Sequence, residues 1–281
     1  MKNICIILLS IPLAGCVGFG PPGSRNVDPV SYATERPTVE IQSPTNYVAS
    51  FFKKDLHRTQ FETQADYDSR IHALQPTGEK VFLQVDQGLV HYVYNADKQV
   101  LTVILPPEVV TGQDFTSGTL RRQVDTASRF TVGRTINDLG TTPMQNGFGA
   151  KADVTYFDEK TYELNVINYI ELPLNLRWRE NAQSYAVGIG LAVPMPGAQA
   201  EALVKCKCVT LILGIAVGDL HHAGHYSVPI TPTIQSPVGA EDDIYEIPAR
   251  ITHMKVYNTE TGLVMASWTT QPPSATTALS H

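Results

Sequence analysis

The densest group of metal-ligating residue types in the chain is a short segment that contains Asp219, His221, His222 and His225. Three of the eight histidines fall within it. Imidazole nitrogens together with a carboxylate oxygen suit zinc or copper. Glycines on both sides favour a loop that follows a strand and wraps around an ion. The spacing is not that of a His-Glu-x-x-His helix, so two hypotheses stay open: a zinc or copper site, or an exposed polar loop.

Two cysteines, Cys206 and Cys208, precede the histidines in the sequence. We expect a strand over 205–217, in which residues two apart face the same side. Three interpretations are open: small buried core residues, a disulfide, or a pair of thiols that binds a soft metal. An extended strand strains disulfide geometry, whereas an oxidising compartment makes unpaired thiols unusual. A disulfide therefore requires a tight turn.

Known catalytic patterns are missing from the sequence. There is no Gly-x-Ser-x-Gly elbow, no phosphate-binding glycine loop and no dinucleotide-binding fingerprint. Ser50 and Lys53 match the Ser-x-x-Lys pattern of penicillin-recognising enzymes, but the accompanying Lys-Thr-Gly is absent. We therefore expect no catalytic residue and predict that the protein is not an enzyme.

The elements that would position these residues are mostly strands. Residues 45–74 are predicted to be largely helical, with Thr63 capping the clearest helix. The polar segment 111–146 is either an elaborate loop or irregular edge strands. From residue 80 the apolar period changes to two, which predicts strands and hairpins. The predicted strands cover 80–85, 89–95, 99–105, 152–157, 162–168, 185–194, 205–217, 250–257 and 263–269, with a turn at 158–160 and a short helix over 198–204.

The N-terminus carries the most specific motif. A single early positive charge at Lys2 is followed by an apolar segment that is shorter than the about 20 residues needed to span a bilayer. This pattern is typical of a secretory signal peptide. The segment ends in Leu-Ala-Gly-Cys at 13–16, which resembles the lipobox of bacterial lipoproteins. The resemblance implies cleavage before Cys16, a diacylglycerol on its thiol and acylation of the new amine.

The residue after the lipidated cysteine predicts whether the anchor lies in the inner or the outer membrane. In Gram-negative envelopes an Asp at that position resembles a retention signal for the inner membrane, and this chain has Val17. We therefore expect a lipid anchor in the outer membrane, with the protein on the periplasmic side. Two or three acyl chains would make that anchor stable. Cleavage removes Lys2 alone among the charged residues, so the net charge of -6 becomes -7.

The chain divides into five expected parts, and its fold class is predicted as α+β, mainly antiparallel β-sheet with a few short helices. The parts are a signal peptide (1–15), a Pro/Gly-rich tether (16–44), an N-terminal α+β part (45–143), a C-terminal β-rich part (144–270) and a disordered tail (271–281).

Composition narrows the function. A hydrophobic content of 43% is too high for a disordered protein, and a net charge of -6 argues against a nucleic-acid partner. We expect a non-enzymatic, lipid-anchored envelope protein that binds envelope proteins or peptidoglycan in an assembly or structural role, without a cofactor. The alternative is a periplasmic metal-binding protein or metal-dependent enzyme, with zinc or copper held by the segment from Asp219 to His225.

Overall fold

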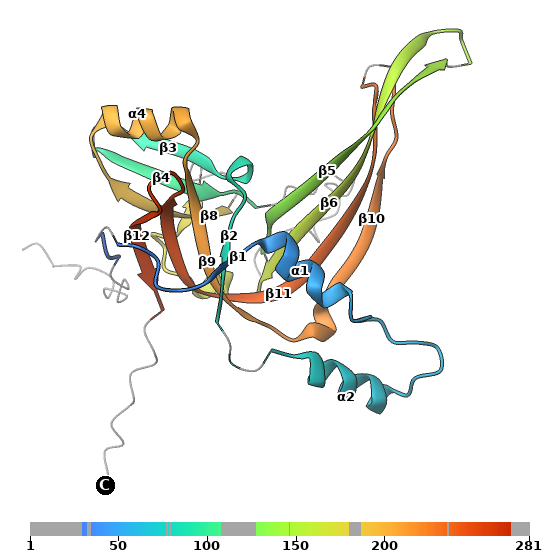
Figure 1. Ribbon diagram of the computed structural model, residues 1–281, viewed down its shortest axis with the longest axis horizontal. Helices are drawn as coiled ribbons and strands as arrows, with labels where there is room; N and C mark the ends of the chain where they lie inside the picture. The colour runs from blue at the N-terminus through green and yellow to red at the C-terminus, as the bar shows by residue number, and fades with distance from the viewer. Residues whose placement is uncertain are drawn as a thin grey trace, which may run out of the picture.

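The structure is a computed structural model that describes residues 30–32, 35–76, 78, 80–107, 128–145, 147–179, 187–234 and 236–270. The predicted signal peptide, Cys16, most of the tether and the C-terminal tail lie outside these ranges. The expected lipobox therefore stays a prediction. Figure 1 shows two regions, a body and an arm of long curved strands that extends away from it.

The larger sheet passes through both regions. Its strand order is β1 (Ile41–Gln42), β2 (Val81–Gln84), β9 (Val209–Val217), β11 (Val238–Asn258), β6 (Lys151–Val166) and β5 (Ser128–Gln145), with β10 (Gly224–Ile230) and β12 (Leu263–Thr269) also paired with β11.

Strand β11 is shared by the arm and the body. Its first half, 238–249, pairs in parallel with β6, and 240–246 pair with β10 on the opposite side. Its second half, 249–258, pairs with β9, and 253–258 pair with β12. We call the arm the assembly of β5, β6, β10 and β11 up to Ala249, with the loops that connect them.

A second, four-stranded sheet completes the body. Its order is β3 (His91–Asn95), β4 (Val100–Leu105), β8 (Val187–Pro194) and β7 (Arg177–Arg179). Side chains of both sheets form one hydrophobic core, in which Leu83, Leu101, Ile189, Leu213 and Ile251 are fully buried. This core is the main source of stability, because burial of apolar surface drives folding.

Short helices cover the edges of the body. Helix α1 (Pro44–Phe52) packs at the base of the arm, and α4 (Gly197–Cys206) precedes β9. Helix α2 (Gln64–Leu74) begins with the predicted cap: Thr63 Oγ1 accepts a hydrogen bond from the amide of Asp66 at 3.2 Å. Three 3₁₀ turns, η1 (Gln87–Leu89), η2 (Tyr169–Glu171) and η3 (Leu220–His222), join the remaining elements.

The predicted fold class is confirmed, because the structure is mainly β with antiparallel-rich sheets and few helices. The strands predicted over 89–95 and 99–105 pair as the hairpin β3–β4, and those predicted over 250–257 and 263–269 pair as the hairpin β11–β12. The expected part boundary at 143/144 falls within β5, and β2 of the first part pairs with β9 of the second. Both parts therefore contribute strands to one sheet.

The predicted hairpin at 158–160 is wrong. Residues 151–166 form one continuous strand, β6, which pairs with both β5 and β11. The charged residues of the supposed turn lie in mid-strand, where Glu159 forms an ion pair with Arg134 at 2.9 Å. Charged side chains are tolerated there because the arm exposes strand residues that a body sheet would bury.

The structure decides between the two alternatives left open for one segment, and it corrects the start of one strand. Of the segment predicted as a loop or irregular edge strands, 128–145 form the long edge strand β5, and 111–127 lie outside the described residues. The strand predicted over 205–217 begins only at Val209, because α4 continues to Cys206.

Candidate functional site

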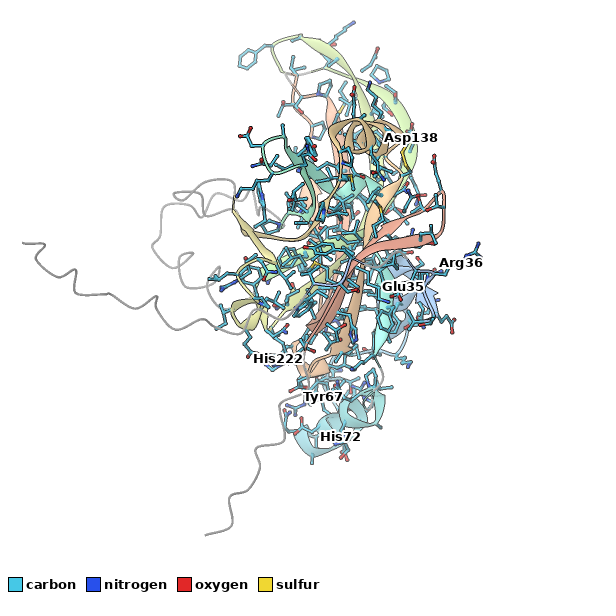
Figure 2. The ribbon with its side chains drawn as sticks, turned by 90° about the vertical axis from the view of Figure 1, so that its left-hand side faces the viewer. Glu35, Arg36, Tyr67, His72, Asp138 and His222 are labelled. Atoms are coloured by element: carbon cyan, nitrogen blue, oxygen red, sulfur yellow. A yellow bond between two sulfur atoms is a disulfide. The ribbon has the colours of Figure 1, made fainter. Side chains whose placement is uncertain are left out.

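The arm is long and poorly covered. Strand β5 has 18 residues, which corresponds to about 60 Å at about 3.3 Å per residue. All of its side chains from Arg134 to Gln145 are exposed, as are those of β10 from His225 to Ile230. Figure 2 shows Asp138 of the arm in the half of the molecule opposite Tyr67 and His72 of α2.

Exposed apolar side chains are concentrated on the arm. Nine of the fifteen large apolar side chains that are exposed in the described residues belong to it. Phe148, in the loop between β5 and β6, is 99% exposed. Single exposed apolar residues are common, whereas a concentration of them marks an interaction surface. The nine are Ile136, Leu139, Met144, Phe148, Tyr226, Val228, Ile230, Ile234 and Val238.

The arm is also acidic. Residues 128–166 and 224–249 contain four Lys or Arg and nine Asp or Glu, a formal charge of -5 out of -6 for the whole chain. Glu241, Asp242 and Asp243 lie in β11 directly beside Asp158, Glu159 and Lys160 of β6. Exposed apolar groups therefore share the arm with a negative field.

An ion pair connects strands β5 and β11 at the base of the arm. Arg129 Nε lies 2.9 Å from Glu246 Oε2, whose side chain is only 6% exposed. Asn165 donates to the other oxygen of Glu246 at 2.8 Å, and Arg129 donates to the Tyr226 hydroxyl. Although the residue as a whole is 37% exposed, desolvation of its hydroxyl, and secondarily the charge of Glu163, raises the pKa of Tyr226 to about 12.

The predicted metal segment is split by the structure. Asp219 caps η3, accepts from the backbone amide of His221, and contacts Nδ1 of the same imidazole at 2.6 Å. His222 Nδ1 is 3.8 Å from Asp219. His225 instead lies on β10, where it stacks on Tyr245 with ring centroids 4.5 Å apart.

The four predicted ligands do not form a preorganised site. Among the described residues, no group of three ligand atoms within 4.8 Å of one another includes any of these histidines. The two ring nitrogens of His221 face different carboxylates, Asp219 and Asp68, and Asp68 lies on α2. Hydrogen bonding from His221 lowers the pKa of Asp219, and hydrogen bonding to Asp219 raises the pKa of His221.

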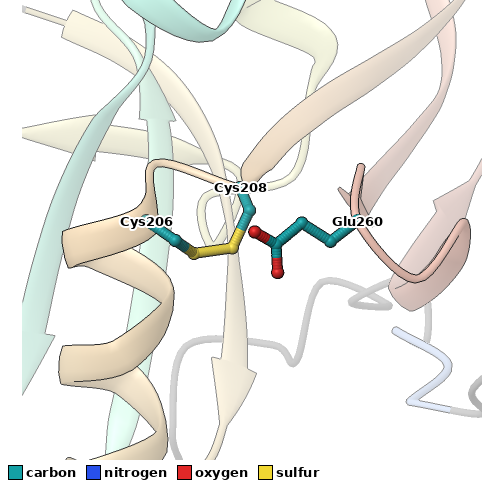
Figure 3. Close-up of side chains that lie close together, drawn as sticks. All are labelled: Cys206, Cys208 and Glu260. Carbon is teal, nitrogen blue, oxygen red and sulfur yellow. A yellow bond between two sulfur atoms is a disulfide. The ribbon is translucent and has the colours of Figure 1, made fainter.

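The cysteine pair forms a disulfide at the end of α4. Lys207 adopts a left-handed conformation with φ of 53°, which turns the chain sharply between Cys206 and Cys208. The prediction that both cysteines lie in a strand is therefore wrong, and the tight-turn alternative describes them. Figure 3 shows the carboxylate of Glu260 directed toward the two sulfurs.

The surroundings of this pair disfavour thiolates. The Sγ atoms and a Glu260 oxygen lie within 4.8 Å of one another. A helix C-terminus and a carboxylate both oppose negative charge on sulfur, and metals bind the thiolate form. In the disulfide the sulfurs also have no ionisable proton. The geometry therefore fits a structural cross-link between α4 and β9 better than a soft-metal pair.

The sequence interpretation did not identify two features that the structure brings forward. One is the arm, whose apolar residues lie on separate strands. The other is Asp68, which meets His221 from a helix 153 positions earlier in the sequence. The sequence did carry a signal that Asp68 could act together with a histidine, since Asp68 and His72 are four residues apart on α2 and share a helical face.

Comparisons with family models, with curated proteins and with solved structures gave no match. Within the described ranges, every helix is too short or too polar to cross a membrane.

Proposed function

We propose that this is a lipid-anchored cell-envelope protein that binds a protein partner through the arm. The observation that supports this most directly is the concentration of exposed apolar side chains on a projecting, acidic sheet. Burial of these apolar side chains against a partner would supply affinity, and the charge would direct the approach.

The charge of the arm narrows the expected partner. Lipid phosphates and the carboxylates of peptidoglycan are negative, so an arm with a charge of -5 repels them. A protein surface with apolar pockets and basic residues around them complements both properties of the arm. Between the two partner classes expected from the sequence, a protein is thus favoured over the cell wall.

The place where the chain enters the body is consistent with an arm that points away from the membrane. The first described residues run beside β12: Ser31 exchanges backbone hydrogen bonds of 2.8 Å with Ser267, and Glu35 pairs with Val264. In Figure 1 this segment lies on the opposite side of the body from the arm. A chain anchored at Cys16 would therefore hold the body near the membrane and direct the arm away from it.

Site-specific photocrosslinking in cells tests the proposed binding. A photoreactive residue in place of Phe148 reports on the tip of the arm, and one in place of Lys98, on the exposed β3–β4 turn, is the matched control. We expect discrete adducts with one protein from the arm position alone. Equal labelling from both positions, or no adduct from the arm, would contradict the proposal.

Charge reversal tests the chemistry of the partner. Glu241→Lys on the arm should reduce the yield of the Phe148 adduct, and Glu40→Lys on the body should leave it unchanged. Both carboxylates are exposed, so neither change should affect folding. An adduct that survives Glu241→Lys at full yield would argue against a basic partner.

The lipid anchor requires its own test, because it rests on the resemblance at residues 13–16. Cys16→Ser should leave the unprocessed precursor and abolish labelling by a radioactive fatty acid. A fully processed Cys16→Ser protein would overturn the anchor and leave the binding proposal standing.

A further inference from the structure

A cleft of about 430 Å³ separates helix α2 from the turn between β9 and β10. Its walls are fixed by Gln75, whose side-chain amide donates to the carbonyl of Gly218 at 2.6 Å and accepts from the amide of Leu220 at 3.1 Å. Ile71, which is 1% exposed, lies on the helix side. The cleft is therefore a built feature of the fold, with polar side chains around an apolar wall.

His221 is oriented within this cleft by contacts on three sides. Asp219 holds its Nδ1 at 2.6 Å, and Tyr67 packs edge to face against the ring with centroids 5.3 Å apart. The remaining nitrogen, Nε2, faces Asp68 Oδ1 at 3.2 Å. A carboxylate on one imidazole nitrogen fixes the ring and makes the opposite nitrogen a better metal ligand.

Helix α2 presents a second imidazole to the same cleft. His72 lines it and lies one helical turn after Asp68, on the same helical face. One carboxylate oxygen and two imidazole nitrogens form a donor set that zinc uses widely. The two carboxylates, Asp68 and Asp219, add the negative charge that favours a divalent cation.

The spacing of the first two donors fits such an ion. Ligands on a tetrahedral zinc with bonds of about 2.0–2.1 Å are about 3.3 Å apart. Asp68 Oδ1 and His221 Nε2 are already 3.2 Å apart, so an ion can replace their hydrogen bond with little movement of either backbone. His72 does not lie within 4.8 Å of both of these donors, so the proposed site requires its exposed side chain to rotate toward the ion.

We propose that Asp68, His72 and His221 bind a zinc-class divalent ion at the edge of this cleft, which His72 and His221 line and where Asp68 contacts His221, with Asp219 positioning His221 through its Nδ1. This set differs from the one expected from the sequence, since Asp219 supports a ligand and His225 takes no part. The proposal is independent of the arm and of its partner.

Cobalt titration of the full-length protein, purified in detergent without a histidine tag, tests the site. Visible absorption of bound Co²⁺ reports the ligand field, and competition with Zn²⁺ gives its affinity. We expect a tetrahedral spectrum for the wild type and a rise in Tm on addition of Zn²⁺. Asp219→Asn should weaken binding by about 10–100-fold, and Asp68→Asn, His72→Gln and His221→Gln should weaken it more.

His225→Gln is the matched control, because it removes a histidine of the same segment that lies outside the cleft. Its affinity should equal that of the wild type. His221→Asn serves as a second variant if His221→Gln alters the Tm without metal. The site is overturned if the wild type binds no Co²⁺, if any of the three ligand variants keeps full affinity, or if His225→Gln loses it.

Discussion

The arm and the body share one strand and differ in almost everything else. In the second half of β11, Ile251, Met254 and Val256 are fully buried. In the first half, Val238 is 40% exposed and Glu241 is exposed as well, and only the end next to the body, with Ile247 and Ala249, is fully buried. Both halves have hydrogen-bonded neighbours on two sides, so pairing does not distinguish them. What differs is whether a second sheet packs against the strand, since the four-stranded sheet covers the larger sheet in the body.

This difference separates stability from recognition. The body has a continuous apolar core and should determine the free energy of unfolding. The base of the arm joins this core through Phe130, Leu164 and Ile247, whereas its outer part leaves apolar side chains in water. That outer part should contribute little to the free energy of unfolding, which frees its sequence for contact with another molecule. Four measurements test this division.

Truncation of large apolar side chains should give the largest contrast. Trp268 in β12 is 1% exposed, and Trp268→Ala should cost about 3–5 kcal/mol because it leaves a cavity in the core. Phe148→Ala on the arm should change stability by less than about 0.5 kcal/mol. Equilibrium unfolding in guanidinium chloride gives both values. Similar losses for the two variants would contradict the division.

Added bulk should show the same contrast in the opposite direction. A Cβ at Gly190 in β8 would lie 2.7 Å from the carbonyl oxygen of Val103, so Gly190→Ala should cost about 1–3 kcal/mol. At Gly147, near the tip of the arm, a Cβ would meet nothing within 4 Å, and Gly147→Ala should cost nothing measurable. Thermal unfolding of the two variants side by side tests this, and a tolerated Gly190→Ala would show that the neighbouring strands β4 and β8 can move apart.

The ion pair at the base of the arm should have an intermediate effect. Arg129→Met leaves the carboxylate of Glu246 buried beside Asn165 and should cost about 1–3 kcal/mol. Arg250→Met is the control, since both Arg250 and Glu171 are about half exposed and such pairs contribute about 0–1 kcal/mol. Hydrogen exchange should locate the loss in the arm for Arg129→Met. A loss spread evenly over β9 and β12 would mean that the arm and body unfold as one unit.

The smallest expected effect is a titration. The pKa of Tyr226 is raised to about 12, above the value of about 10 for an unfolded chain. Its contribution to stability is therefore present below pH of about 10 and is lost as the pH rises through the folded pKa. Tyrosinate absorbance of wild type minus Tyr226→Phe gives the pKa directly. A value near 10 would show that the base of the arm is open to water.

Local signals in the sequence predicted much of the body. The cap at Thr63 depends on a side chain and an amide three residues later, and the β3–β4 turn on Asn95 Oδ1, which accepts from the amide of Lys98 at 2.9 Å. Such contacts form between residues that are close in the sequence, so residue types alone can predict them. The alternation of β2, β4 and β12 predicted strands because one face of each is buried.

The arm was predicted poorly for the converse reason. Strand β6 carries Asp158, Glu159 and Lys160 in its middle, a pattern that usually marks a turn. It remains a strand because β5 and β11 pair with it from both sides, and neither partner is adjacent to these residues in the sequence. The contact between Asp68 and His221 was missed in the same way, since only the folded chain brings α2 to the turn after β9.

The continuity of β11 has a mechanical consequence. Its 21 residues are hydrogen-bonded to β6 and β10 at one end and to β9 and β12 at the other, and β12 carries the entering chain at Ser31 and Glu35. A pulling force on the tip, directed along β11, loads the hydrogen bonds of β11 with β9 and β12 in shear. Many of these bonds then resist together instead of opening one by one. Force applied by a partner would thus pass through one stiff strand to the end of the molecule where the chain enters.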